Sequence, residues 1–319
     1  MDRFESMSAF VAVARAGGFS AASRELGIPL ATISRRVADL EAELGARLLH
    51  RSTRQVVLTE TGQTFFATCR RVLDDLKDAE EAVSGEYRAP KGELTITAPM
   101  GFGRLHLQPV ALEFLAAYPD INLRLLLVDR VVDLVEEHVD LALRIAELPD
   151  STLISRPLGH VRMVVGASGE YLKRRGTPGH PSELMSHDCI AWSTLGPLNS
   201  FWFRVENRDQ QFATRTRLWT TSADSATAAA TSGLGLVQTT GYQAEQGVRD
   251  GTLAIVLREF ECPMTPVSLV YASNRLLPLK LRAFIDFAAP RLADRLRKIA
   301  STLEEAGHRA STRARRRKK

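Results

Sequence analysis

Apolar and polar residues alternate in different patterns along this chain, and the first pattern is helical. Over residues 3–44, apolar side chains recur every three or four positions, as in amphipathic helices. We expect helices at residues 3–16, 21–26 and 29–44, because Gly17, Gly27 and Gly45 stand where they would end. Two short extended segments follow at residues 47–49 and 55–58. Three helices followed by a β-hairpin predict a winged helix-turn-helix.

Residues 60–88 form the longest helical pattern of the chain. Their apolar positions share the spacing of a heptad repeat: Phe65, Cys69, Val72, Leu76, Ala79 and Val83. At about 1.5 Å per residue such a helix is on the order of 40 Å long, more than a small neighbouring domain covers. We therefore expect it to pair with a second copy of the chain. The alternative is that the repeat packs on its own domain.

Beyond a hinge with Pro and Gly at residues 87–92, expected strands and helices alternate. Strands are expected at 94–98, 122–128, 141–145, 163–167, 189–192, 234–239 and 267–271. Helices are expected at 104–118, 131–137, 181–185, 222–231, 242–249 and 278–292. Strand–helix alternation predicts an α/β fold with open parallel sheets, here in two lobes with a cleft between them.

These patterns divide the chain into four regions. Residues 1–60 are expected to form the winged helix-turn-helix, and residues 61–91 a linker helix and hinge. Residues 92–293 are expected to form the two-lobed domain, with lobe I at about 92–161 and 267–293 and lobe II at about 162–266. Residues 294–319 are expected to form a basic C-terminal tail.

Composition excludes several classes of protein. The chain has 319 residues, 45% hydrophobic and 25% charged, which is ordinary for a soluble globular protein. It contains no run of about 18 apolar residues and no apolar leader segment, so we expect a cytoplasmic protein with no membrane partner. Cys69, Cys189 and Cys262 are too far apart for a metal site or a disulfide framework. We expect them to be buried, with redox sensing as the alternative.

The formal net charge of +5 is concentrated at the C-terminus. Residues 309–319 contain seven of the 42 basic residues and no acidic ones. The other 35 basic residues face 37 acidic ones, a net charge of −2. Such a run is typical of a disordered, solvated extension. The alternative is a sequence-independent attraction to phosphate groups.

The third expected helix has a face suited to DNA. At 100° per residue, one stripe is apolar and consists of Ile33, Val37, Leu40 and Leu44. Arg35 lies opposite this stripe, and the small Ala31 and Thr32 would let the backbone approach the major groove. Arg35 can bind guanine through two hydrogen bonds. Arg36 lies at the flank, where we expect a phosphate contact, and Ser34 can reach a phosphate or a base edge.

The expected hairpin adds two cations to this surface. Arg51 and Arg54 lie at its tip, where they can contact the DNA backbone or the minor groove. The alternative for Arg35 is a solvated helix face with an ion pair to Asp39, four residues away. Residues 1–60 hold eight basic and seven acidic residues, so binding would depend on placement and dimerisation rather than on bulk charge.

Residues 10–62 resemble the DNA-binding region of LysR-type transcriptional regulators. The motifs that carry the likeness are Phe19-Ser20-Ala21-Ala22, Leu26, Ser34-Arg35, Leu40-Glu41, Leu44-Gly45, Leu48-Leu49, Arg51 and Leu58-Thr59-Glu60-Thr61-Gly62. The likeness continues from GELTITAPM onward and covers roughly residues 3–293. One departure is the apolar start Leu30-Ala31, where many members carry Gln or Ser; these residues can contact a thymine methyl group instead.

The resemblance implies a winged helix-turn-helix, a dimerising linker helix and a two-lobed α/β domain like a type 2 periplasmic binding protein. It also implies promoter DNA, a small-molecule effector and RNA polymerase as partners, and a homotetramer built as a dimer of dimers.

Effector-binding residues are expected at the carboxyl ends of strands and at helix starts. They are Pro99, Met100, Gly101, Phe102, Arg144, Ile145, Trp202, Ser222 and Ala223. Arg144 can pair with a carboxylate, and Trp192 and Trp202 can form an apolar wall. The alternatives are that Ser222 only caps a helix, that Arg144 bridges surface carboxylates and that the tryptophans are core. Asp224 would repel an anion, so either it points away or the ligand is not simply anionic.

Two other functions compete with transcriptional regulation. A solute-binding protein of a transport system could use the same two-lobed fold, but the helix-turn-helix and the missing leader argue against it. For an enzyme, the sequence lacks GxSxG, HExxH, P-loop and CxxC motifs, and its seven histidines do not cluster. We therefore expect no catalytic residues, no metal and no cofactor.

Overall fold

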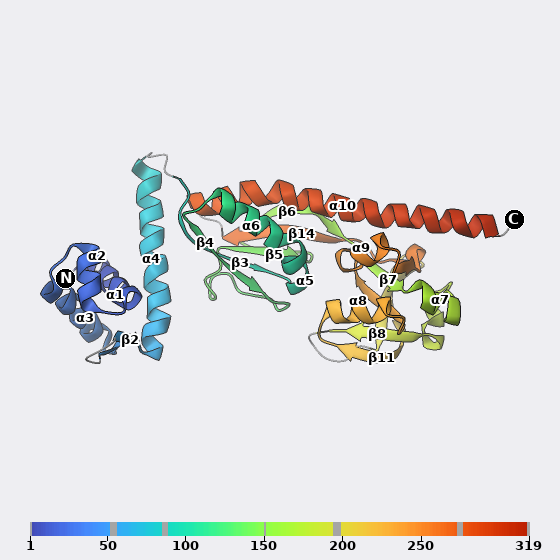
Figure 1. Ribbon diagram of the computed structural model, residues 1–319, viewed down its shortest axis with the longest axis horizontal. Helices are drawn as coiled ribbons and strands as arrows, with labels where there is room; N and C mark the ends of the chain where they lie inside the picture. Colours follow the sequence, from blue (N-terminus) through green and yellow to red (C-terminus); the bar gives the residue numbers. More distant parts are fainter. Residues whose placement is uncertain are drawn as a thin grey trace. The chain divides into compact units, whose positions relative to one another are not determined.

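A computed structural model describes residues 2–51, 56–84, 89–149, 151–193, 199–272 and 277–317. The chain forms two compact units, Met1–Ala89 and Pro90–Lys319 (unit 1 and unit 2), which Figure 1 shows in sequence colours. In these described ranges, no helix is both long enough and apolar enough to span a membrane.

Unit 1 is a winged helix-turn-helix followed by a long helix. Its elements are α1 (Arg3–Ala16), α2 (Phe19–Leu26), α3 (Leu30–Leu44), β1 (Leu49–Arg51), β2 (Val56–Leu58) and α4 (Glu60–Ser84). The antiparallel hairpin pairs Leu49 with Leu58. The predicted helix ends are confirmed, because Gly17, Gly27 and Gly45 take left-handed φ values of 68°, 66° and 62°.

The core of unit 1 also contains the first half of α4. Phe10 of α1 is fully buried and lies 5.9 Å from Phe65 between ring centroids, and Cys69 is fully buried in the same cluster. The heptad repeat therefore begins by packing on its own domain, because three short helices enclose only a small core. Leu76 further along is 37% exposed and free to meet another surface. The side chains of Ala79 and Val83 lie outside the described residues.

Unit 2 contains two five-stranded sheets, one in each lobe (Figure 1). Lobe I holds β4 (Ile121–Leu127), β3 (Gly92–Ala98), β5 (Leu141–Ile145), β14 (Thr265–Ala272) and β6 (Leu153–Val161), in spatial order. Lobe II holds β11 (Arg215–Thr220), β8 (Asp188–Trp192), β12 (Leu236–Thr240), β7 (Met163–Ala167) and β13 (Ala254–Val256), with a separate hairpin of β9 (Ser200–Val205) and β10 (Arg208–Ala213).

The sheets are mixed, so the prediction of parallel sheets is wrong in part. Strands β4, β3 and β5 run parallel, but β14 is antiparallel to both β5 and β6. In lobe II, β12 is parallel to β8 and antiparallel to β7. The chain leaves lobe I after β6 and returns as β14. The direction of β14 in the sheet of lobe I is therefore not set by a short connection to a neighbouring strand.

The helices of unit 2 flank these sheets. They are α5 (Met100–Phe102), the π-helix η1 (Gly103–Leu107), α6 (Gln108–Ala117), α7 (Gly169–Arg175), the 3-10 helix η2 (Pro181–Ser186), α8 (Ala223–Thr231), α9 (Gly241–Arg249), the 3-10 helix η3 (Arg258–Phe260) and α10 (Leu279–Arg317). The predicted helix at 131–137 is instead a series of turns. Strands β6, β9, β10, β11 and β13 and helix α7 were not predicted.

The last helix is much longer than predicted and lies along both lobes (Figure 1). Leu296 packs against Gly159 of β6 in lobe I, and Leu303 packs against Gly241 of α9 in lobe II. Residues 294–303 are therefore part of the fold, and assigning them to a tail is wrong. The sequence contained the signal, because the buried positions Leu292, Leu296, Ile299 and Leu303 repeat at intervals of 4, 3 and 4.

Candidate functional site

Helix α3 exposes the face that its sequence predicts. Ile33, Val37 and Leu40 are fully buried against the rest of unit 1. Ala31 and Arg35 are exposed, and Thr32 and Ser34 are half-buried. No ion pair joins the described side chains of Arg35 and Asp39, so the alternative proposed for Arg35 has no support. The exposed face is small and polar with an arginine at its centre, which suits the major groove.

The turn between α2 and α3 fixes the start of that face. The Gly27 amide donates to the Ser23 carbonyl, and the Ser23 hydroxyl donates to the Ile28 carbonyl at 2.7 Å. Pro29 precedes the first turn of α3 with φ of −55°. These bonds satisfy backbone groups that the two helix ends leave free. Leu30 follows with 47% of its surface exposed, so the apolar start of the helix is accessible.

Arg36 is already engaged within unit 1. Its guanidinium forms an ion pair with Glu5 of α1, and only 21% of its side chain is exposed. The pair joins α1 to α3 at the flank of the exposed face. A phosphate contact by Arg36 would therefore compete with Glu5, and this contact stays a prediction.

The hairpin is held at a fixed angle to α3 by side-chain bonds to the backbone. One carboxylate oxygen of Glu41 accepts from the amides of Leu48 and Leu49, at 2.8 and 3.1 Å. The Thr59 hydroxyl accepts from the Gly62 amide at 2.9 Å and so caps α4. A Cβ on Gly62 would lie 2.0 Å from the Leu48 carbonyl oxygen, so this position requires glycine.

The two arginines predicted at the hairpin tip remain predictions. Arg51 ends β1, where its backbone pairs with Val56, but its side chain lies outside the described residues. Arg54 lies wholly outside them. The hairpin follows α3 directly in the sequence.

In unit 2, the predicted segment at residues 99–102 lies where the two lobes meet. A Cβ on Gly101 would lie 2.2 Å from Nε2 of Gln243, which belongs to α9 of lobe II. The buried ring of Phe102 stands edge-on to Tyr242, with centroids 5.2 Å apart. Pro99 ends the preceding strand and sets the start of α5. Gly101 and Phe102 are therefore part of the contact between the lobes.

Charged groups at this contact are paired. The Met100 amide donates to Oδ1 of Asp129 at 2.8 Å, so a carboxylate of the chain already occupies the start of α5. Asp224 of α8 forms an ion pair with Arg104 of lobe I at 2.8 Å. The question about Asp224 is answered in part: its charge is balanced by an arginine from the other lobe.

Ser222 and Ala223 stand at the start of α8, beside this ion pair. The Ser222 hydroxyl accepts from the Ser225 amide at 3.3 Å, so its capping role is shown. The Ala223 carbonyl accepts from the Thr227 hydroxyl at 2.8 Å. Both residues are half-buried and keep part of their surface accessible.

Arg144 and Ile145 serve the internal structure of lobe I. The Arg144 guanidinium donates to the Val132 carbonyl, and burial lowers its pKa while the charge of Glu137 opposes that shift. Ile145 pairs with Val267 across the sheet. Arg144 thus holds the turn that follows β4, a role that differs from the bridge to surface carboxylates considered above.

The two predicted tryptophans meet at one glutamine of lobe II. The backbone of Trp202 accepts from and donates to the side-chain amide of Gln238, at 2.6 and 3.0 Å. The indole N–H of Trp192 donates to the backbone carbonyl of Gln238 at 2.9 Å. Trp202 is 51% exposed and Trp192 is half-buried, so neither is wholly core.

Several residues at the lobe contact were missed by sequence reasoning: Arg104, His106, Asp129, Tyr242 and Gln243. His106 is only 7% exposed, and neither ring nitrogen has a hydrogen-bond partner. Burial lowers its pKa to about 4, and the positive charge of Arg295 adds to this effect. Its ring lies 5.0 Å from Phe102 and 5.9 Å from Tyr242. No local sequence pattern marks such a histidine, because its aromatic neighbours Phe102 and Tyr242 come from different lobes.

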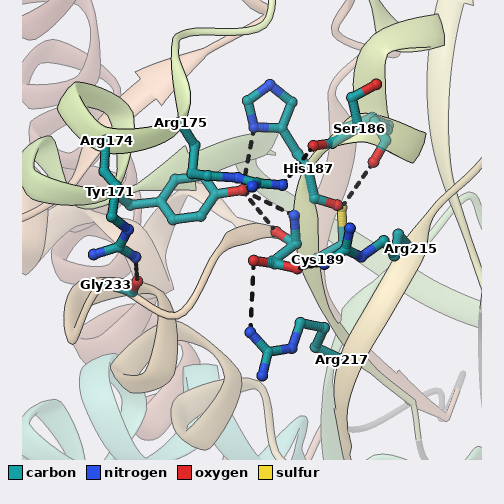
Figure 2. A network of polar contacts seen from close by, with 11 residues as sticks. Tyr171, Arg174, Arg175, Ser186, His187, Cys189, Arg215, Arg217 and Gly233 are labelled. Carbon is teal, nitrogen blue, oxygen red and sulfur yellow. Dashed lines mark hydrogen bonds and ion pairs between the residues drawn. The ribbon is translucent and has the colours of Figure 1, made fainter.

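A second polar cluster, in lobe II, is structural. The Tyr171 hydroxyl accepts from the Asp188 amide at 2.9 Å and lies 3.1 Å from Nδ1 of His187 (Figure 2). Arg215 pairs with the largely buried Asp188 carboxylate at 2.7 Å. Burial raises the pKa of the adjacent Cys189 thiol to about 12, so it stays protonated at neutral pH. The cluster fastens α7 to β8.

The other two cysteines also fit the expectation of burial better than redox sensing. Burial raises the pKa of the Cys69 thiol to about 12 and also raises that of Cys262. Cys69 is buried and Cys262 is half-buried. Because the thiolate is the reactive form, thiols with raised pKa values react slowly.

Comparison with known proteins assigns both units. Residues 4–63 match the family described as bacterial regulatory helix-turn-helix protein, lysR family. Residues 88–293 match the family described as LysR substrate binding domain. A transcriptional regulator of Xanthomonas campestris is 38% identical over 287 residues, which cover 89% of this chain and 83% of that protein. The regulator CrgA of Neisseria meningitidis is 33% identical, over 92% of this chain and 98% of its own.

Solved structures agree with this result. The structure of CrgA, a LysR-type transcriptional regulator from Neisseria meningitidis, matches with a TM-score of 0.59 and 33% identity, over 90% of this chain and 98% of its own. The full-length Vibrio cholerae virulence activator AphB matches with a TM-score of 0.57 and 28% identity, over 89% of this chain and 97% of its own.

Proposed function

This chain belongs to the LysR family of bacterial transcriptional regulators, and on that premise we propose that it binds promoter DNA by sequence and responds to a small molecule held between the lobes of unit 2. The observation that carries the DNA-binding part is the exposed face of α3, with Arg35 opposite the buried stripe. The family is one of transcriptional regulators and not of enzymes. The competing role as a transport solute-binding protein leaves the helix-turn-helix without a purpose.

At the DNA, each residue of the α3 face has a distinct role. Arg35 binds a guanine edge in the major groove, and Ala31 and Thr32 allow close approach or contact a thymine methyl. Ser34 reaches a base edge or a phosphate. Arg36 binds a phosphate group in place of the Glu5 carboxylate. Arg51 and Arg54 on the hairpin contact the backbone or the minor groove.

Binding of this kind requires more than one copy of the chain. One α3 helix reads only a few base pairs, and dimers of helix-turn-helix proteins bind half-sites about one helical turn apart. We assign the dimer contact to α4 beyond its buried half, where Leu76 is exposed. We further propose assembly into a homotetramer, a cytoplasmic location and a contact with RNA polymerase.

The effector site is proposed at the contact between the lobes. Gly101 and Phe102 contact lobe II there, directly after Pro99 and Met100. Ser222 and Ala223 start α8 beside the Arg104–Asp224 ion pair. Arg144, Ile145 and Trp202 stay candidates for effector contacts. A ligand that separates Arg104 from Asp224, or replaces the Asp129 carboxylate on the Met100 amide, would shift the position of one lobe relative to the other.

The test compares Arg35→Ala with Arg36→Gln on the promoter fragment upstream of the chain's own gene. Arg35→Ala should lose about 1–3 kcal/mol at one base pair, which weakens binding by roughly 5- to 150-fold and relaxes the preference at that position. Arg36→Gln should weaken binding to all sequences by a similar factor and leave the preference intact. Unchanged promoter binding by Arg35→Ala would contradict the assignment of the α3 face.

A further inference from the structure

The end of α10 carries a charge that the proposed function does not use. Residues 309–319 hold seven basic residues and no acidic one, whereas the rest of the chain has a net charge of −2. Both matched families end before this segment, the second of them at residue 293. The net positive charge of the chain thus arises from its last eleven residues.

The helix continues beyond Leu303, the last large apolar residue of the sequence. Leu303 is 1% exposed, and the α10 backbone stays helical to Arg317. From residue 304 to 319 the sequence contains no large apolar residue. Positions 309, 313, 316 and 317 fall within about 100° of one another on a helix. This segment therefore has the composition of a cationic surface and lacks that of a packing surface.

The DNA-binding unit has little net charge of its own. Residues 1–60 carry eight basic and seven acidic residues. Three of these arginines form ion pairs within unit 1: Arg3 with Glu43, Arg15 with Glu25 and Arg36 with Glu5. Proteins that bind duplex DNA draw their sequence-independent affinity from contacts between cations and phosphates. Three of the eight cations of residues 1–60 are thus engaged within unit 1 and less available to phosphate groups.

We propose that residues 309–319 bind the phosphate backbone of duplex DNA without sequence preference, and that they supply most of the electrostatic attraction between this chain and DNA. The inference rests on the proposed function, because it assumes that the chain acts on DNA. A membrane surface fits less well, since an interfacial helix needs large apolar side chains on one face. A protein partner fits less well too, since interfaces depend on aromatic or aliphatic anchors.

The experiment uses the full chain and two matched double variants of α10. Arg316→Gln with Arg317→Gln removes two cations from the basic end. Arg297→Gln with Lys298→Gln removes two cations from an upstream turn of the same helix, where the side chains are 71% and 70% exposed and pair with Asp294. Affinity for a random-sequence duplex and for the promoter fragment is measured from about 50 to 200 mM salt.

The proposal expects a change in salt dependence for one variant only. Neutralising Arg316 and Arg317 should reduce the slope of log affinity against log salt by about 2 in magnitude, on both DNAs, and replacing all seven cations by up to about 6. The upstream variant should keep the parental slope. Tryptophan fluorescence should show the same unfolding of unit 2 in both variants, because Arg297 and Lys298 are exposed and the sequence beyond Leu303 contains no large apolar residue.

An unchanged slope in the Arg316/Arg317 variant would overturn the proposal, and so would an equal change in the upstream variant. Stronger loss of binding to phosphatidylserine vesicles than to duplex DNA would assign the segment to membranes instead. The proposed function fails separately, if the parental chain shows no preference for the promoter over the random duplex. In that case the slope still decides the role of residues 309–319.

Discussion

His106 should make the stability of unit 2 fall in mild acid. The histidine is buried at the contact of α5, α9 and α10, and its ring nitrogens have no partner to stabilise a proton. Its pKa is lowered from the usual 6.5 to about 4. The folded chain therefore takes up this proton less readily than the unfolded chain, and acidification favours unfolding.

The size of the effect follows from the two pKa values. A difference of about 2.5 units corresponds to about 3 kcal/mol at 1.36 kcal/mol per unit. This contribution is fully present above pH 6.5 and is lost as the pH falls towards 4, with about 2 kcal/mol already lost at pH 5. Such a loss is large beside the usual stability of a domain.

Urea unfolding followed by tryptophan fluorescence measures this effect selectively. All three tryptophans, Trp192, Trp202 and Trp219, belong to unit 2. His106→Phe and His106→Leu replace the titrating group with an apolar side chain. The parental chain should lose about 2 kcal/mol more than either variant between pH 7.5 and pH 5. If parental chain and variants lose the same amount, His106 is not the source of acid sensitivity.

Two further predictions concern packing. Gly62→Ala places a Cβ 2.0 Å from the Leu48 carbonyl oxygen and should destabilise unit 1 by about 1–3 kcal/mol; Gly18→Ala, whose Cβ meets nothing within 4 Å, is the control in thermal unfolding of unit 1. Leu303→Ala should lower the free energy of unfolding of unit 2 by about 2–5 kcal/mol, measured by tryptophan fluorescence, because this leucine is buried on α9. A loss below about 0.5 kcal/mol would contradict the assignment of this stretch of α10 to the core of unit 2.

Much of the α3 surface could be predicted because it depends on local geometry. Helical periodicity alone separates the buried Ile33, Val37 and Leu40 from the exposed Arg35. The glycine at each helix end marks a left-handed residue that other side chains avoid. The ion pair between Arg36 and Glu5 could not be predicted, because the two residues lie on different helices and are 31 positions apart in the sequence.

The site in unit 2 shows the opposite balance. The sequence pattern located Gly101 and Ser222 at strand ends and helix starts, but it did not predict which residues of one lobe contact which residues of the other. Only the fold brings Arg104 to Asp224 and buries His106 against Tyr242. It also turned Arg144 to a backbone carbonyl of its own lobe.

The sequence by itself determined the helix-turn-helix, the long α4, the two-lobed α/β class and the basic end of the chain. Each follows from periodicity, helix-ending glycines or charge, which act over a few neighbouring residues. The tertiary structure decided the strand directions, the reach of α10 across both lobes and the ion pair between Arg104 and Asp224. Those outcomes depend on residues far apart in the sequence, such as Arg104 and Asp224, which only the folded chain brings into contact.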